Sequence, residues 1–194
     1  MITAKPALSD QYLNSLYPVS IQEHARLHWT PLPVARKAAL FLAGTDQSIV
    51  LDIGSGVGKF CLGAAAYAPD TYFFGVEQRK ELVEHANAAK KELRINNVTF
   101  LHANFTQINL AMFDHFYFYN AFYENLSSAD KIDDTIAYSS ELYRYYTAYL
   151  YTELRKKPSG TRLCTLCGSE DQIPPEFQEI GSFMDDLLKF WIKL

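Results

Sequence analysis

Short apolar runs alternate with longer amphipathic stretches from residue 49 onward. Continuous apolar runs predict buried strands, and apolar residues three and four apart predict helices. The predicted strands are Ile49–Ile53, Tyr72–Val76, Val98–His102, His115–Tyr119 and Thr161–Cys167, and the predicted helices are Val57–Ala68, Gln78–Ile95 and Asn125–Lys157. Because helices connect successive strands, the pattern predicts a doubly wound α/β fold with a mostly parallel sheet covered on both faces.

The two ends of the chain depart from this alternation. Residues 1–45 are mainly helical by pattern and precede the sheet. The last strand pair, between Phe177 and Leu194, predicts an antiparallel hairpin about Asp185-Asp186.

The long helix predicted from Asn125 begins with a capping signal at Ser127-Ser128-Ala129-Asp130. One apolar stripe is expected to pack on the sheet: Ile132, Ile136, Tyr143, Leu150 and Leu154. A second stripe lies on another face of the same helix: Tyr138, Leu142, Tyr145 and Tyr149. The sequence leaves three alternatives for what packs on this second stripe: the N-terminal segment Tyr12–Trp29, a second subunit or the substrate.

Composition narrows the classes of protein that fit this pattern. Of the 194 residues, 48% are hydrophobic and 21% are charged, which excludes a disordered chain. We expect one domain over residues 1–194, with a helical lid or extension at 1–45 and a cofactor-binding core at 46–194. The net charge of −4 indicates no extensive nucleic-acid surface.

Membrane and metal partners are not expected either. No apolar run reaches the roughly 18–20 residues that cross a bilayer, and the first ten residues lack a secretory pattern. The three cysteines, Cys61, Cys164 and Cys167, suit a reducing cytoplasm, and no His or Cys spacing predicts a metal site.

The most informative segment is a glycine-rich turn, in which Gly54, Gly56 and Gly58 follow the first predicted strand. Glycines allow a sharp turn and a close approach of the backbone to a ligand, next to the free N–H groups of a helix N-terminus. Asp52 precedes this turn, with Ser55 inside it. A carboxylate there disfavours a pyrophosphate and suits a ligand with an ammonium or sulfonium charge, which favours S-adenosylmethionine over a dinucleotide.

Further polar residues end the next strands. Glu77 and Gln78 follow the second strand, and a carboxylate there can accept hydrogen bonds from both ribose hydroxyls. Asn104 and Phe105 follow the third strand, where an amide and a ring suit an adenine. Asn120 follows the fourth strand. The carboxyl ends of parallel strands share one edge of a sheet, so these residues predict a single ligand site.

On these residues the sequence resembles the class I S-adenosylmethionine-dependent methyltransferases. The motifs are Asp52-Ile-Gly-Ser-Gly-Val-Gly58, Gly75-Val-Glu77, Ala103-Asn-Phe105 and the terminal hairpin. The resemblance implies a seven-stranded sheet of order 3-2-1-4-5-7-6 with the last strand antiparallel. It also implies that Asp52 and the glycine turn hold the methionine part, Glu77 the ribose, and Asn104 with Phe105 the adenine.

Narrower resemblances concern the methyl acceptor. Tyr119-Asn-Ala-Phe122 and the motifs above are similar to blocks of the non-SET histone lysine methyltransferases, and Asn120-Ala-Phe-Tyr123 is loosely similar to the Asn-Pro-Pro-Tyr box of amino-methylating nucleic-acid enzymes. Both imply an amine acceptor, such as a protein lysine or a small-molecule amine. We expect Asn120 and Tyr123 to be catalytic, with Asn120 holding the acceptor through its side-chain carbonyl.

The N-terminal extension supplies the last candidates. Trp29 and Thr30 precede a predicted helix, and related methyltransferases often fold such a segment over the cofactor, so both are predicted cofactor contacts. The sequence thus predicts a methyltransferase that acts as a monomer or as a homodimer through its tyrosine-rich helix. A small-molecule O-methyltransferase and a non-catalytic S-adenosylmethionine-binding protein stay open as alternatives.

Overall fold

The sheet confirms the predicted α/β architecture. The computed structural model describes residues 8–44, 47–126 and 131–194. The strands are β1 (Ile49–Ile53), β2 (Tyr72–Glu77), β3 (Val98–His102), β4 (His115–Tyr119), β5 (Arg162–Leu166), β6 (Phe177–Phe183) and β7 (Leu188–Lys193). They form one sheet of order β3-β2-β1-β4-β5-β7-β6. Strands β1 to β5 pair in parallel, whereas β7 is antiparallel to both β5 and β6, as predicted.

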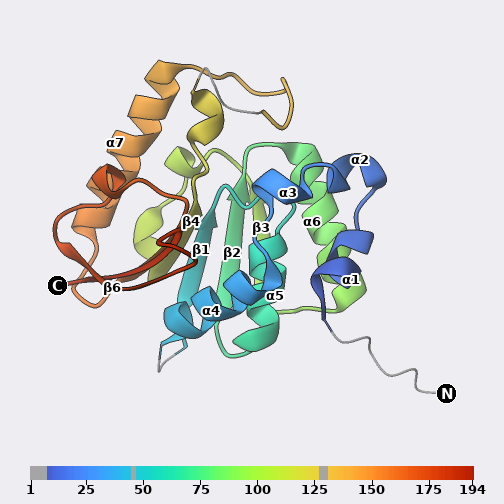
Figure 1. Cartoon of the computed structure of the whole chain (residues 1–194), viewed down its shortest axis with the longest axis horizontal. Helices are drawn as coiled ribbons and strands as arrows, with labels where there is room; N and C mark the ends of the chain where they lie inside the picture. Colours follow the sequence, from blue (N-terminus) through green and yellow to red (C-terminus); the bar gives the residue numbers. More distant parts are fainter. Residues whose placement is uncertain (1–7, 45–46, 127–130) are drawn as a thin grey trace.

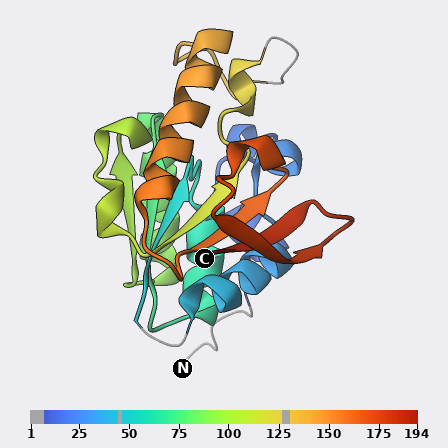
Figure 2. The ribbon, with the colours of Figure 1, turned by 90° about the vertical axis from the view of Figure 1, so that its left-hand side faces the viewer.

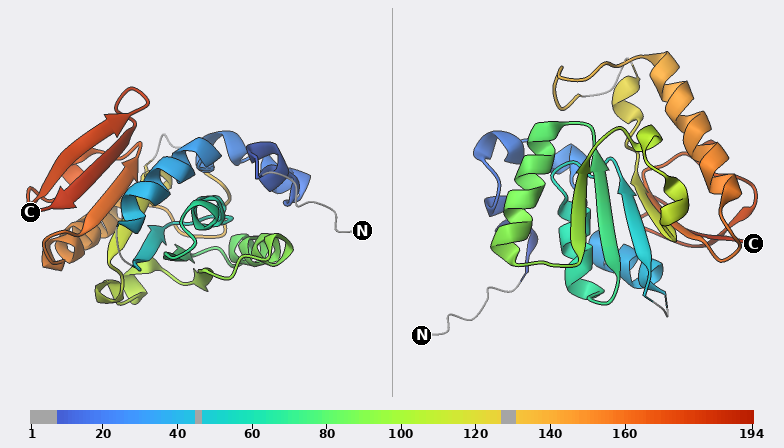
Figure 3. Two further views of the ribbon diagram at one scale, coloured as in Figure 1. Left: turned by 90° about the horizontal axis from the view of Figure 1, so that it is seen from below. Right: turned by 180° about the vertical axis from the view of Figure 1, so that it is seen from behind.

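Helices cover both faces of this sheet (Figures 1 and 3). The α-helices are α1 (Asp10–Ser15), α2 (Val19–Gln22), α3 (Ala25–His28), α4 (Leu32–Ala43), α5 (Lys59–Tyr67), α6 (Lys80–Leu93) and α7 (Ser140–Lys156). Short 3₁₀ turns lie at η1 (Phe105–Gln107), η2 (Leu110–Met112), η3 (Tyr123–Asn125) and η4 (Glu170–Gln172). None of the described helices is long and apolar enough to span a membrane.

Two hydrophobic cores result from the alternation of side chains along the strands. Val50 and Phe73 point into the core beneath α4, α5 and α6, which also contains Leu13, Tyr17 and Trp29 of the N-terminal segment. The opposite face carries a second core, formed by Leu51, Phe116 and Phe118 with Leu150 and Leu154 of α7. Phe116 and Phe118 are fully buried, as expected for sheet residues.

The helix predicted from Asn125 begins much later, so this prediction is wrong over its first half. α7 starts at Ser140, and the hydroxyl of Ser139 accepts the backbone N–H of Leu142 as its cap. Residues 131–139 form neither helix nor strand. The predicted cap at 127–130 lies outside the described residues. The physical reason is that Asp133 and Tyr138 bond to the side chain of Arg79 instead of facing solvent along a helix.

The later start of α7 also changes the predicted stripes. Ile132 and Ile136 are not on the helix, and both line the pocket described below. The buried face of α7 is Tyr146, Leu150 and Leu154. Figure 2 shows α7 standing beside the sheet and projecting past the carboxyl ends of the strands.

Candidate functional site

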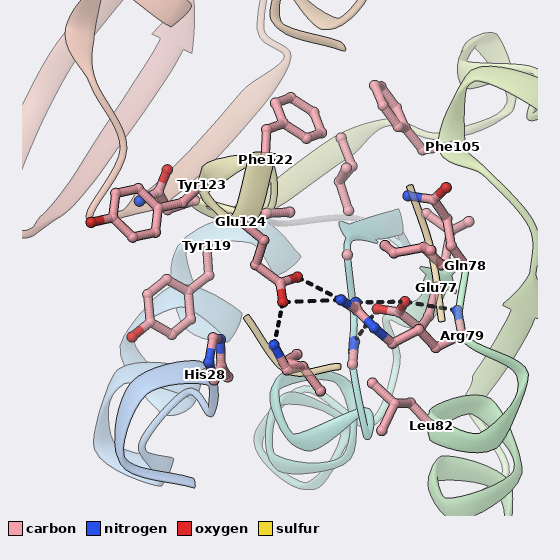
Figure 4. A pocket seen from close by; sticks show the side chains of 18 of the residues that line it. His28, Glu77, Gln78, Arg79, Leu82, Phe105, Tyr119, Phe122, Tyr123 and Glu124 are labelled. Carbon is pink, nitrogen blue, oxygen red and sulfur yellow. Dashed lines mark hydrogen bonds and ion pairs between the residues drawn. The ribbon is translucent and has the colours of Figure 1, made fainter. Parts of the chain in front are cut away.

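One pocket of about 340 Å³ opens at the carboxyl edge of the sheet. Its floor is the glycine turn after β1 and the end of β2, and its walls come from residues 119–125, residues 132–138 and the N-terminal segment. Figure 4 shows Glu77, Arg79, Phe105, Tyr119 and Glu124 around this space. The volume lies in the range of small-molecule sites. The predicted convergence of strand ends therefore produces a real cavity.

The glycine turn exposes its backbone to the pocket at Gly56. The three glycines all have positive φ, between 52° and 78°. A Cβ on Gly54 would lie 2.4 Å from the Cβ of Ala121, and one on Gly58 would lie 2.3 Å from the ring of Phe100. A Cβ on Gly56 would meet no atom within 4 Å. Gly54 and Gly58 are thus required by packing, whereas only Gly56 faces open space.

Glu77 lies at the end of β2 and holds this turn. Its Oε2 accepts the N–H of Gly56 at 3.1 Å, and its Oε1 accepts the N–H of Arg79 at 2.9 Å. Burial raises the pKa of Glu77. The backbone hydrogen bonds that the carboxylate accepts and the positive charge of Arg79 both oppose that rise. The result is a buried carboxylate at the pocket floor with a fixed orientation.

Arg79 is the residue that our sequence reasoning missed. Its guanidinium contacts Glu124 through two 2.9 Å bonds, Asp133 at 3.2 Å and the phenol oxygen of Tyr138 at 2.6 Å. Burial disfavours its charge, but the carboxylates of Glu124 and Glu77 raise its pKa above the usual value. The only sequence signal is a basic residue two positions after a strand-end carboxylate, and its partners are far away along the chain.

Asp52 is buried beneath the turn and does not line the pocket. The thiol of Cys61 donates to its Oδ2 across 3.6 Å. Burial raises the pKa of Asp52 to about 8, and the nearby Glu77 adds to the rise. The neighbouring Ser55 has a buried Oγ that makes no hydrogen bond within the described part of the chain.

The strand-end residues on the β3 side form a polar and aromatic wall. The amide of Asn104 donates to Gln78 at 3.0 Å and to the phenol oxygen of Tyr146 at 2.8 Å. Gln78 and Phe105 line the pocket, and Asn104 supports them from behind. The ring of Phe105 stacks on that of Phe122, with centroids 5.0 Å apart.

The segment after β4 supplies the opposite wall. Asn120 has a left-handed backbone, with φ of 38°, which turns the chain sharply at the strand end. Tyr119, Asn120 and Tyr123 line the pocket, and Tyr123 is 42% exposed at its mouth. Phe122 also lines the pocket, but its side chain is almost fully buried in the core.

The two candidates of the N-terminal segment are separated by the fold. Trp29 lines the pocket, and its ring lies against Tyr17 and under the amine of Lys59. Thr30 is buried behind it, where its hydroxyl bonds to the phenol of Tyr117 at 2.9 Å. Only Trp29 can therefore touch a ligand directly in this conformation.

The residues present fit a nucleoside ligand with a cationic amino acid part. The open face of Gly56 and the buried carboxylate of Glu77 together offer a close backbone approach and hydroxyl acceptors, whereas Ser55 does not line the pocket. Among the described residues, no group of three His, Cys, Asp or Glu side chains could hold a metal ion.

Comparisons with known proteins connect this site to a family. Residues 46–120 match the model of a family described as "Putative methyltransferase". A tRNA (guanine-N(7)-)-methyltransferase of Synechococcus sp. (strain JA-3-3Ab) is 55% identical over 58 residues, which are 30% of this chain and 25% of that protein. The chain thus spans about a quarter of the length of the curated relative that it matches.

Solved structures confirm the fold. A methyltransferase from Geobacter sulfurreducens has a TM-score of 0.62 at 13% identity, with 95% of this chain and 96% of that chain covered. An RNA methyltransferase from Salinibacter ruber, in complex with S-adenosyl-L-homocysteine, has a TM-score of 0.58 at 19% identity, with 84% and 92% covered.

The relatives also correct the predicted partners. An amine acceptor was predicted from local similarity, and the lack of an extensive nucleic-acid surface from the net charge of −4. Several curated relatives are named as tRNA (guanine-N(7)-)-methyltransferases, which contradicts both predictions. The physical reason is that a net charge averages over the whole surface and does not report a local contact surface. The fold is that of the class I S-adenosylmethionine-dependent methyltransferases, and residues 46–120 match a methyltransferase family model, in agreement with S-adenosyl-L-methionine as the predicted cofactor.

Proposed function

We propose that this chain transfers a methyl group from S-adenosylmethionine to a nucleobase nitrogen of RNA, with N7 of a guanine in tRNA as the acceptor. The assignment of the acceptor is supported by the 55% identity to a tRNA (guanine-N(7)-)-methyltransferase over a segment that covers a quarter of that relative. The pocket at the sheet edge supports the reaction because it can hold a donor and an acceptor side by side.

The cofactor would lie on the floor of the pocket. In this proposal Glu77 accepts the two ribose hydroxyls, and Gly54, Gly56 and Gly58 allow the backbone to approach the methionine part. Asp52 and Ser55 act from below the turn, where the positive charge of the bound donor favours the ionised form of Asp52, which in turn attracts the ammonium and sulfonium groups. The donor, when bound, supplies an activated methyl group on sulfur.

The adenine would lie against the wall on the β3 side. Phe105 offers a ring face, and Gln78 offers an amide that Asn104 orients through their 3.0 Å hydrogen bond. On the N-terminal side Trp29 covers the pocket, and Thr30 positions that segment through its bond to Tyr117. Residues 1–45 then serve as an extension of a single methyltransferase domain that covers residues 1–194, and a cytoplasmic location stays a prediction.

The acceptor chemistry of guanine N7 suits the residues after β4. The N7 lone pair forms the new N–C bond while the C–S bond breaks, so positive charge passes to the purine ring and no proton has to be removed. Alignment and exclusion of water therefore matter more than a general base. Tyr119 and Tyr123 offer ring faces for the purine, and Asn120 offers an amide for its edge.

A transfer assay tests the proposal. Purified protein is incubated with methyl-labelled S-adenosylmethionine and with tRNA, RNA depleted of tRNA, or total protein, and the digested RNA is analysed for 7-methylguanosine by mass spectrometry. We expect label in tRNA that Glu77→Gln strongly lowers and that Glu81→Gln, an exposed matched change, retains. Label confined to protein would overturn the RNA acceptor, and absence of calorimetric S-adenosylhomocysteine binding would overturn the cofactor site.

A further inference from the structure

Arg79 joins the floor of the pocket to one of its walls. Its side chain is only 5% exposed, although it carries a full charge. On one side its Nη1 lies 3.5 Å from Oε1 of Glu77, the carboxylate at the floor. On the other side it binds Glu124, Asp133 and Tyr138. Figure 4 shows its guanidinium between the carboxylates of Glu77 and Glu124.

The wall at residues 131–138 depends strongly on these contacts. It has neither helical nor strand hydrogen bonding. The N–H of Ile132 donates to Oε1 of Glu124 at 2.7 Å, and the phenol of Tyr138 donates to the carbonyl of Asp133 at 2.7 Å. Both Glu124 and Tyr138 are themselves bound by Arg79. The guanidinium is thus the shared partner of the groups that place this segment.

The same segment brings apolar and aromatic groups to the pocket. Ile132, Ile136 and Tyr138 all line it, across from the glycine turn. A displacement of residues 132–138 would therefore change the shape of the site without touching the strands.

We propose that Arg79 is a positioning residue that links the cofactor carboxylate Glu77 to the wall formed by residues 131–138. This inference rests on the proposed function, since it concerns the same site. A nucleoside bound to Glu77 adds hydrogen bonds to a carboxylate that already faces the guanidinium, and the guanidinium in turn holds Glu124, Asp133 and Tyr138. Because such coupling is reciprocal, an ordered wall also strengthens cofactor binding.

Hydrogen exchange measured by mass spectrometry on peptides that cover residues 131–138 tests this role. In Arg79→Gln without ligand we expect these amides to exchange about tenfold faster than in the wild type, while the amides of β1 to β5 keep their protection. Lys80→Gln is the matched control, because Lys80 is adjacent in sequence and exposed, with only a 3.6 Å contact to Glu84. It should leave the exchange unchanged.

The second arm adds S-adenosylhomocysteine. In the wild type the ligand should slow hydrogen exchange across residues 131–138. In Arg79→Gln the ligand should still bind, because Gly56 keeps its bond to Glu77, but it should no longer slow this exchange. In the transfer assay Arg79→Gln should raise the KM for tRNA more than that for the donor.

Two milder variants protect the test against misfolding of Arg79→Gln. Tyr138→Phe removes one partner of the guanidinium and Asp133→Asn removes the negative charge of another, while its bonds to Glu124 stay. Faster exchange of residues 131–138 in both supports the proposal, and wild-type exchange in both overturns it. Failure of the ligand to bind the wild type would overturn the cofactor function and the linkage together, whereas the ligand-free comparison still decides whether Arg79 positions the wall.

Discussion

The phenol of Tyr17 donates a hydrogen bond of 3.0 Å to the carbonyl oxygen of Val57, which lies in the glycine turn. Close by, the amine of Lys59 forms an ion pair of 2.7 Å with Asp10 and a bond to Asn14. The N-terminal segment is therefore fixed to the turn by polar contacts, in addition to the apolar packing of Leu13 and Trp29.

Replacement of Tyr17 by Phe tests this attachment. It removes only the hydroxyl and leaves the carbonyl of Val57 without a buried donor, so we expect a loss of about 1 kcal/mol in the free energy of unfolding. Urea denaturation measures the loss, and Tyr12→Phe, on the preceding helix α1, is the control. Equal midpoints for the two variants would contradict a structural role of the bond.

Glu77 provides the sharpest test of the cofactor site. Glu77→Gln keeps the size of the side chain but replaces one acceptor oxygen with a donor, which opposes both the N–H of Gly56 and a ribose hydroxyl. We expect a loss of affinity for S-adenosylhomocysteine of about 10- to 100-fold by calorimetry. An unchanged affinity would contradict the placement of the ribose at this carboxylate.

The raised pKa of Asp52 should make the stability difference between the wild type and Asp52→Asn depend on pH. Its folded pKa of about 8 lies above the ordinary value of 3.8, so the folded state binds more protons than the unfolded state between these two values. Stability contributed by this group is therefore present at low pH and is lost as the pH rises from about 4 to about 8. Asp52→Asn should gain stability relative to the wild type over that window, on the order of a few kcal/mol at pH 8.

The measurement is urea denaturation of both proteins at several pH values between 4 and 8. Taking the difference between variant and wild type cancels the titration of groups that the two share. A difference that is the same at pH 5 and pH 8 would show that Asp52 is charged in the folded protein throughout this range.

Two glycines of the turn should behave differently when replaced. Gly58→Ala places a Cβ 2.3 Å from the Phe100 ring, so we expect a loss of about 2–4 kcal/mol in unfolding free energy. Gly56→Ala has free space but a φ of 52°, so about 1 kcal/mol is expected. Its methyl group enters the pocket, and calorimetry should show weaker S-adenosylhomocysteine binding with the fold intact. Normal binding by this variant would place the ligand elsewhere.

Phe122 and Tyr123 are neighbours with separable roles. Phe122 is 3% exposed and packs on Phe105 and Phe118, so Phe122→Ala should cost about 3–5 kcal/mol of stability. Tyr123 is 42% exposed, so Tyr123→Ala should cost less than about 1 kcal/mol while lowering tRNA methylation about tenfold through lost stacking. Thermal unfolding and the transfer assay measure the two effects. Full activity of Tyr123→Ala would remove it from the acceptor site.

The sequence predicts the bounds of a strand best where the pattern within that strand alone determines them. Val98–His102 and His115–Tyr119 match the structure residue for residue, because their apolar runs are bounded by polar turns. Likewise Glu77 and Asn120 could be placed at strand ends without knowledge of their neighbours.

The start of α7 could not be predicted in the same way. Its position depends on Arg79, which binds Asp133 across 54 positions and Tyr138 across 59 positions of the chain. Within residues 125–157, Ser139 is a local capping signal, but the contacts with Arg79 that keep residues 131–138 out of the helix are not contained in that stretch. The helical spacing of Ile132 and Ile136 was real but incidental, because both residues serve the pocket instead of a helix face.

The order of the last three strands affects the sequence in which the strands of the sheet can pair. β7 lies between β5 and β6, although β6 is made first. β6 therefore has no partner in the sheet until residues 188–193 have been synthesised, whereas the parallel strands β1 to β5 can already pair. During translation the half of the sheet that carries the pocket can thus form first, and the hairpin joins it as a later, separate event.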